Sequence, residues 1–120
     1  MNYIIPENMI EIVYCCHPEN KPSGVLLMGY LNNNFAGTAV ASVIGIMLEL
    51  ESIHTDPLSR KNGVASALLH EVRNWGRQMG ADYLTGELVV RRDTSTVEEV
   101  VSWYRHRGID VVKGKLVGRL

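Results

Sequence analysis

The sequence predicts an α+β fold, in which a sheet is accompanied by two main helices in one domain over residues 1–120. Two periodicities of the apolar residues support this prediction. Up to Thr55 the pattern favours strands, and after Gly63 apolar residues recur every three or four positions, as on an amphipathic helix. A chain of 120 residues is long enough to bury one core without disulfides or a metal.

Four strands are expected before the first helix. A polar turn that ends at Gly24 follows the first strand, and the asparagine run at residues 32–34 follows the second. The third segment is rich in small residues, so its composition also permits a short buried helix. The four expected strands cover residues 9–14, 24–31, 36–45 and 47–55.

Successive side chains of the fourth strand are expected on opposite faces of the sheet. Strict alternation gives one face Glu49, Glu51, Ile53 and Thr55, and the other face Leu48, Leu50, Ser52 and His54. Both carboxylates are therefore expected on the face that carries Ile53.

The first helix is expected to start after Gly63 and to end at Gly80, which suits a C-terminal cap. Its apolar residues form a single stripe, as expected for a helix that packs along a sheet. The members of the stripe are Val64, Leu68, Val72, Trp75 and Met79.

A fifth strand at residues 83–90 is expected before the second helix. The capping-box pattern from Thr96 to Glu99 opens that helix, and Gly108 stops it. Its buried stripe is Val97, Val100, Val101 and Tyr104. Residues 111–120 leave room for a closing hairpin around Gly114.

The charge composition argues against some classes of function. The formal net charge is -1, and the mixed charges form no broad basic face for nucleic acid. The cations at residues 105–107 lie at a helix end, where they are more often partners of the helix dipole than a binding site. No apolar run approaches the length of a membrane span, and residues 1–6 lack the features of a secretory signal, so we expect no membrane partner and a cytoplasmic protein.

The two cysteines, Cys15 and Cys16, are adjacent. Neighbouring residues do not easily reach disulfide geometry, so they are interpreted as reduced thiols. His17 follows them, but no second pair of ligands lies at the spacing of a zinc site. We therefore expect no metal.

The segment from Ile53 through Pro57 to Gly63 joins the fourth strand to the first helix. A helix N-terminus offers backbone N–H groups and a positive dipole end to an anion, and a glycine has no Cβ to hold a phosphate away. The glycine motifs for nucleoside triphosphates and dinucleotides do not occur. The segment therefore predicts a pyrophosphate cradle, and the alternative is a polar connection whose glycine only relieves a tight turn.

This loop resembles the acyl-CoA loop of the GNAT acetyltransferase superfamily. The signature of that loop, Arg/Gln-x-x-Gly-x-Gly/Ala, is matched by Arg60, Gly63 and Ala65. The resemblance extends over about residues 24–120, because residues 49–57 and 64–72 are similar to the flanking strand and helix. The pair Trp103-Tyr104 followed by Gly108-Ile109 is similar to the end of the last helix of the family.

The resemblance implies a mixed, mostly antiparallel sheet whose parallel central strands splay apart around acetyl-CoA, the cosubstrate. Main-chain groups of Ile53 and Thr55 would pair with pantetheine as an added strand does. The pyrophosphate would be held by backbone N–H groups of Arg60, Lys61, Asn62, Gly63, Val64 and Ala65, and by the hydroxyl of Ser66. Arg60 and Lys61 are alternatively ordinary solvated charges.

The resemblance also implies catalytic residues for transfer to an amine. Tyr104 would protonate the departing thiolate, and Glu49, with Glu51 in reserve, would accept the proton of the amine. The alternatives are a core aromatic for Tyr104, surface charges for both carboxylates, and a mechanism without a dedicated base. His54 ranks below both carboxylates.

The chain departs from the family before residue 31, where too few residues are present for a strand and two helices. The expected function is N-acetyltransfer from acetyl-CoA to an amine of a small molecule or protein by direct attack in a ternary complex. The alternatives are a catalytically reduced CoA-binding module with a regulatory or assembly role, and a structural domain without a cofactor. A homodimer is a further hypothesis, motivated by the short N-terminal region and the aliphatic pattern of residues 36–47.

Overall fold

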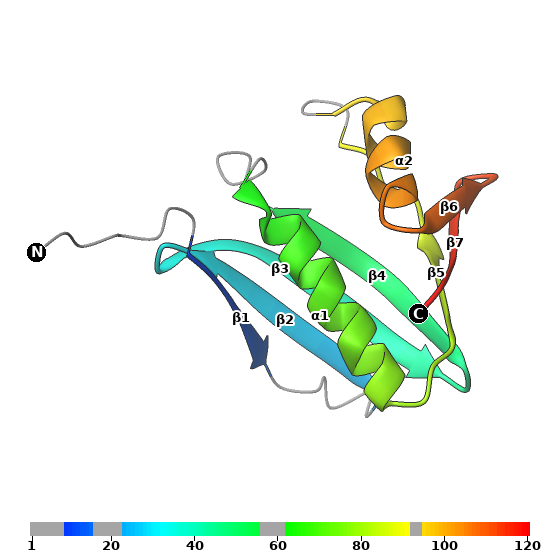
Figure 1. The fold of residues 1–120 in the computed structure, drawn as a ribbon, viewed down its shortest axis with the longest axis horizontal. Coiled ribbons are helices and arrows are strands. Elements are labelled where there is room, and N and C mark those ends of the chain that lie inside the picture. The colour runs from blue at the N-terminus through cyan, green and yellow to red at the C-terminus, as the bar shows by residue number, and fades with distance from the viewer. Residues whose placement is uncertain (1–8, 16–22, 56–61, 92–94) are drawn as a thin grey trace, which may run out of the picture.

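The computed structural model describes residues 9–15, 23–55, 62–91 and 95–120. Within these ranges the chain forms one seven-stranded sheet and two helices (Figure 1), which confirms the predicted α+β class. The strands are β1 (Ile10–Cys15), β2 (Gly24–Leu31), β3 (Asn34–Ile44), β4 (Met47–Thr55), β5 (Tyr83–Glu87), β6 (Ile109–Val112) and β7 (Lys115–Arg119). The helices are α1 (Val64–Gln78) and α2 (Val97–Arg105).

The sheet has the strand order β1-β2-β3-β4-β5-β7-β6. Its neighbouring strands are antiparallel except β4 and β5, which run parallel in the centre. A parallel pair requires a crossover connection, and α1 supplies it. The predicted mixed sheet with a parallel central pair is therefore confirmed.

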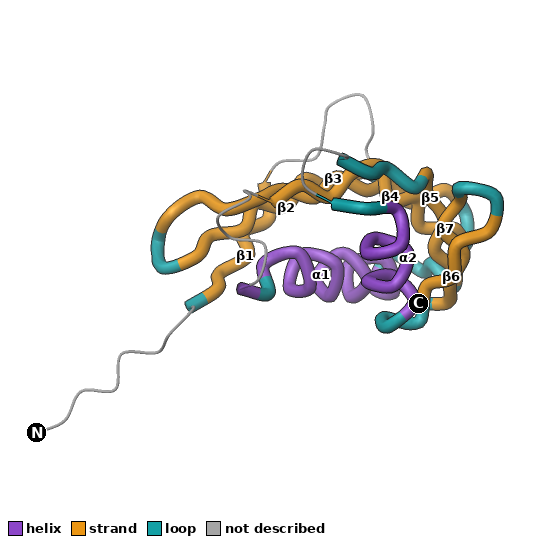
Figure 2. The backbone as a smooth tube through the Cα atoms, turned by 90° about the horizontal axis from the view of Figure 1, so that it is seen from above, coloured by secondary structure: helices purple, strands orange, loops and turns teal. Residues whose placement is uncertain are grey.

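Both helices lie on the same side of the sheet (Figure 2). α1 packs across β1 to β4, and α2 packs against β6. The apolar stripe of α1 provides the centre of the core, where Val64, Leu68 and Val72 have no exposed surface. In the parts of the chain that the structure describes, neither helix is long and apolar enough to cross a membrane.

Most predicted elements agree with the structure. Residues 34–44 form a strand and not the alternative helix, and the closing hairpin turns at Lys113 and Gly114, both with positive φ. The fifth strand was expected to reach residue 90 but ends at Glu87. It ends there because its partner strand β7 starts at Lys115, directly after the hairpin turn.

The register of β4 contains one extra residue. Val40 of β3 pairs with Ser52, whereas the next residue, Ala41, pairs with Leu50, so Glu51 is inserted as a β-bulge. The bulge reverses the alternation. As a result Ile53 shares the buried face with Leu50, and the predicted common face of Glu49 and Ile53 is wrong.

The bulge coincides with the point at which β4 and β5 separate. Their ladder runs from Met47 and Tyr83 to Leu50 and Gly86, while β4 continues to Thr55. The strands approach closely at the last pair, since a Cβ on Gly86 would lie 2.6 Å from the carbonyl oxygen of Leu50. A close contact followed directly by divergence gives a V-shaped gap in the sheet.

Replacing Gly86 with alanine is expected to destabilise the fold by about 1–3 kcal/mol, because the backbones at the apex of the gap must move apart. Urea unfolding measures this effect. Thr85→Ala, on the neighbouring residue, adds no atoms and should cost less than about 1 kcal/mol. Equal unfolding midpoints for Gly86→Ala and the parent would contradict the close approach of β4 and β5.

Candidate functional site

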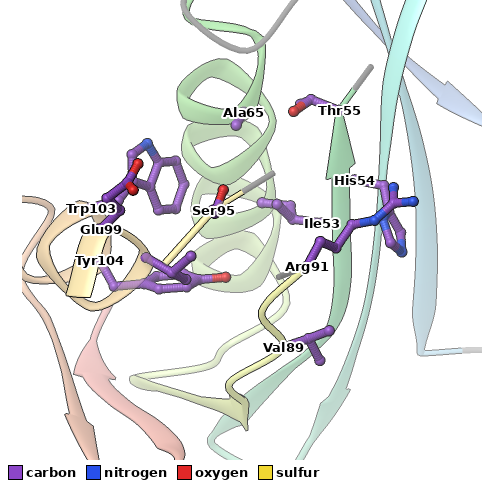
Figure 3. Close-up of a pocket in the computed structure, with 11 residues that line it drawn as sticks. Ile53, His54, Thr55, Ala65, Val89, Arg91, Ser95, Glu99, Trp103 and Tyr104 are labelled. Carbon is purple, nitrogen blue, oxygen red and sulfur yellow. The ribbon is translucent and has the colours of Figure 1, made fainter. Parts of the chain in front are cut away.

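A pocket of about 310 Å³ lies where β4 and β5 diverge (Figure 3). β4 contributes Ile53 and Thr55, and the first turn of α1 contributes Ala65. On the opposite wall α2 supplies Trp103 and Tyr104. We call this the strand-gap pocket, and its lining is completed by His54, Val89, Arg91, Ser95, Glu99 and Val100.

The N-terminus of α1 adjoins this pocket and differs from that of α2. Gly63 is the N-cap residue of α1, with φ 86° and ψ 7°, and no described side chain caps the helix. The first intrahelical bond runs from the N–H of Ala67 to the carbonyl of Gly63, so the preceding N–H groups of the first turn have no helical acceptor. The first turn also carries no acidic residue. These properties favour an anion at this helix end.

α2, in contrast, satisfies its own N-terminus. The side chain of Thr96 accepts a hydrogen bond from the N–H of Glu99, and the Glu99 carboxylate accepts one from the N–H of Thr96. This is the capping box that the sequence predicts. Of the two helices, α1 is therefore the one whose N-terminus has no cap from the described residues and suits a ligand.

The predicted cradle residues lie in different environments. Arg60 and Lys61 lie outside the described residues, so the structure does not place their side chains. Val64 is fully buried in the core and has only main-chain groups to offer. The hydroxyl of Ser66 accepts hydrogen bonds from Nε and Nη2 of Arg107, at 3.2 and 2.6 Å, on the side of α1 away from the strand-gap pocket.

Tyr104 is held by packing and its hydroxyl points into the strand-gap pocket (Figure 3). The residue is only 8% exposed, and the Trp103 ring meets it edge-on at a centroid distance of 4.9 Å. Burial raises the pKa of the Tyr104 phenol above its ordinary value of 10.0. Among the described residues the hydroxyl has no hydrogen-bond partner. Its O–H can therefore donate to a bound group.

The acidic candidates do not join Tyr104 in the pocket. Glu49 is exposed and lies on the face of β4 opposite to Ile53, because of the bulge at Glu51. His54, which was expected on the face opposite to Glu49, shares its face and lines the pocket. The bulge has no signature in the sequence, which is why alternation misplaced these residues.

Arg107 has a role that the sequence did not reveal. It was interpreted with its neighbours as a dipole partner, but its guanidinium lies 4.2 Å from the centroid of the Trp103 ring and bridges to Ser66 of α1. Arg105, in contrast, pairs with Asp110 at 3.0 Å. Two arginines of one predicted cluster thus make quite different contacts. In the described ranges no three His, Cys, Asp or Glu residues gather as a metal site requires.

A comparison with sequence models of protein families identifies one family. Residues 5–108 match the sequence model described as the acetyltransferase (GNAT) family. No significant match was found among curated proteins.

Several solved acetyltransferases share the fold. The chain is 22% identical to nourseothricin acetyltransferase, with a TM-score of 0.63, and the match covers 82% of this chain and 64% of that one. It is 12% identical to IAA acetyltransferase from Bacillus cereus, with a TM-score of 0.73 and coverage of 93% and 100%. A GNAT family acetyltransferase from Elizabethkingia anophelis, solved with acetyl-CoA bound, is 13% identical with a TM-score of 0.69 and coverage of 92% and 95%.

The Tyr104 phenol is expected to ionise above pH 10, later than an unburied tyrosine, because burial raises its pKa. The tyrosinate absorbance lost in Tyr104→Phe measures this titration. The stability that the neutral phenol contributes is complete below pH 10 and disappears as the pH rises through the raised pKa. Tyr104→Phe should therefore unfold like the parent at neutral pH and resist alkali better. A Tyr104 titration below pH 10 would contradict the buried environment.

Proposed function

The chain belongs to the acetyltransferase (GNAT) family, and we propose that it transfers the acetyl group of acetyl-CoA to an amine by direct attack in a ternary complex. One observation carries the proposal: the uncapped N-terminus of α1 adjoins a gap between two parallel strands. An anion and an extended chain are the ligands that these two features accommodate. Acetyl-CoA contains both, a pyrophosphate and a pantetheine arm.

The pantetheine arm is proposed to lie along β4. The ladder to β5 ends at Leu50, so the following main chain near Ile53 and Thr55 faces the gap, where an extended group can pair with it as an added strand. The cradle from Arg60 to Ser66 is proposed to hold the pyrophosphate through backbone N–H groups. The positive φ and absent side chain of Gly63 suit such a close approach.

Acetyl-CoA supplies a thioester whose carbonyl is activated towards amines. Tyr104 is proposed to donate its phenolic proton to the sulfur as the C–S bond breaks and the new C–N bond forms. The phenol carries this proton at neutral pH, since its ordinary pKa is 10.0 and burial raises it further. Glu49 is proposed to accept the amine proton through water, since its exposed carboxylate lies on the other sheet face, with Glu51 in reserve. His54 competes for this role because it lines the pocket.

A second function has a specific observation in its favour. Because Glu49 lies outside the strand-gap pocket that Tyr104 lines, the fold also suits a CoA-binding module with little turnover and a regulatory or assembly role. Binding of acetyl-CoA without transfer to any amine would favour it.

The acceptor is proposed to be an amine of a small molecule or a protein. The proposal includes a cytoplasmic location, which the adjacent cysteines Cys15 and Cys16 favour.

The proposal also includes a homodimer that completes the acceptor side of the gap. Exposed apolar residues at the β3–β4 turn, Ile44 and Ile46, support such an association. Sedimentation that shows an active monomer would contradict it.

Calorimetric titration with acetyl-CoA and CoA tests the proposal first. We expect dissociation constants in the micromolar range or below, about −8 kcal/mol or better, for both ligands. Acetylation of an amine panel, followed by mass spectrometry, then separates the enzyme from the binding module. No heat and no thermal stabilisation with either ligand would contradict both functions.

Gly63→Asp and Gly63→Asn form a matched pair that isolates the charge at the cradle. Both residues tolerate the left-handed conformation, so they share any backbone strain. Aspartate should stabilise α1 through the helix dipole, by about 0.3–1 kcal/mol, yet weaken CoA binding at least about tenfold relative to asparagine through repulsion of the pyrophosphate. Calorimetry and thermal unfolding measure the two opposite effects. Equal CoA affinities would contradict the cradle.

Tyr104→Phe is expected to lower kcat about 100-fold while the affinity for acetyl-CoA changes little, because the ring remains and only the proton donor is lost. Steady-state kinetics on the best acceptor measure this change. Measuring kcat/KM over a range of pH for Glu49→Gln and His54→Gln identifies the base. The variant in which kcat/KM no longer rises with pH has lost it. An unchanged kcat in Tyr104→Phe would show that the proton comes from elsewhere.

A further inference from the structure

A second hollow lies along α1, from Ser66 in its first turn to Arg77 in its last turn, and the charged groups of its lining are arginines. Its volume is about 320 Å³, and its lining is Ser66, Leu69, His70, Arg73, Arg77 and Arg107. We call it the arginine hollow. The chain as a whole has a formal net charge of -1, so this accumulation of cations is local.

Among the described residues, the arginines of this hollow have carbonyls, amides or hydroxyls as partners, and no carboxylate. Arg73 donates to the carbonyl oxygens of Arg107 and Arg119, at 2.6 and 2.8 Å, and Arg77 donates to the side chain of Asn74. No salt bridge to these side chains occurs among the described residues. Asp110, which follows α2, pairs with Arg105 and not with an arginine of the hollow.

This crowding of cations is unfavourable without an anion. Burial and the neighbouring charge of Arg77 lower the pKa of Arg73, and burial lowers that of Arg107. Three of the five N–H donors of Arg107 are used by Ser66 and Trp103, which leaves donors on both terminal nitrogens. The Arg107 guanidinium is also fixed by the Trp103 ring, and a fixed fork of this kind suits a phosphate.

The position of the hollow relative to the strand-gap pocket narrows the choice of anion. Ala65 lines the strand-gap pocket and the next residue, Ser66, lines the arginine hollow, so the uncapped end of α1 lies between the two. Trp103 lines the strand-gap pocket, and the guanidinium of Arg107, which lines the arginine hollow, lies over its ring. Arg73 follows Ser66 by seven residues, about 10 Å of helix rise, which its long side chain shortens.

A ligand that reaches both hollows must therefore carry an extended arm, a central diphosphate and a further phosphate beyond it. We propose that the arginine hollow binds the 3′-phosphate of coenzyme A and makes the protein prefer CoA to 3′-dephospho-CoA. The assignment rests on the acetyl-CoA function proposed above. Arg107 and Arg73 contact this phosphate, and Arg77 at the outer end attracts it.

Calorimetric titration of the full chain with CoA and with 3′-dephospho-CoA tests the assignment. The parent is expected to bind CoA at least about tenfold more tightly. Arg73→Gln and Arg77→Gln should each reduce this ratio at least about threefold, while the affinity for 3′-dephospho-CoA stays within about twofold. Arg77 is exposed, and its one hydrogen bond within the described ranges goes to Asn74, so its replacement does not threaten folding.

Arg105→Gln is the matched control, because it removes the same charge from the end of α2 but outside the hollow. The CoA preference should persist in this variant, and a similar loss would reduce the effect to general electrostatics and overturn the site. Equal binding of CoA and 3′-dephospho-CoA by the parent would overturn it while the proposed function stands. Failure of both ligands to bind would overturn the function as well.

Inorganic phosphate distinguishes a free ion from the phosphate of the cofactor. If inorganic phosphate weakly raises the unfolding temperature of the parent but not of Arg73→Gln, and CoA is preferred to 3′-dephospho-CoA, the result supports the site. Stabilisation by phosphate together with equal binding of the two cofactors would mean that the hollow takes a free phosphate, and would overturn the assignment.

Discussion

The shape of the site depends on one extra residue in β4. If β4 kept strict alternation, it could continue beside β5, and the centre of the sheet would be closed. The bulge at Glu51 bends the strand at the point where its ladder to β5 ends, and Gly86 allows the two backbones to come close just before they part. Ile53 and Thr55 are thereby turned towards the pocket, and the α1 N-terminus follows at its edge.

The two helices divide structural and binding tasks. α2 has a complete capping box and presents Tyr104 and Trp103 to the pocket from a helix that is satisfied at its own start. α1 buries its apolar stripe against four strands and leaves its first N–H groups for a ligand. A side-chain cap is typically worth about 1 kcal/mol. No described side chain gives α1 this contribution, and its extensive burial against the sheet offsets the loss.

Much of the fold could be predicted because local patterns determine it. A few neighbouring residues are enough to recognise three features. These are the apolar stripe from Val64 to Trp75, the capping box of Thr96 and the loop that ends at Gly63. The position of Glu49 could not be predicted, since a bulge depends on how β3 and β4 pair and not on the composition of β4. The bridge from Arg107 to Ser66 joins residues 41 positions apart, so no local pattern could reveal it.

The stacking of Arg107 on Trp103 gives the molecule a built-in optical reporter. The chain has two tryptophans, and Trp75, on the buried face of α1, is 7% exposed, so its emission is a constant background. Trp103 lies between the strand-gap pocket and the arginine hollow, and a cation beside its ring makes its fluorescence sensitive to the local field. Occupation of either hollow changes that field, so the unlabelled protein can report ligand association in a stopped-flow experiment.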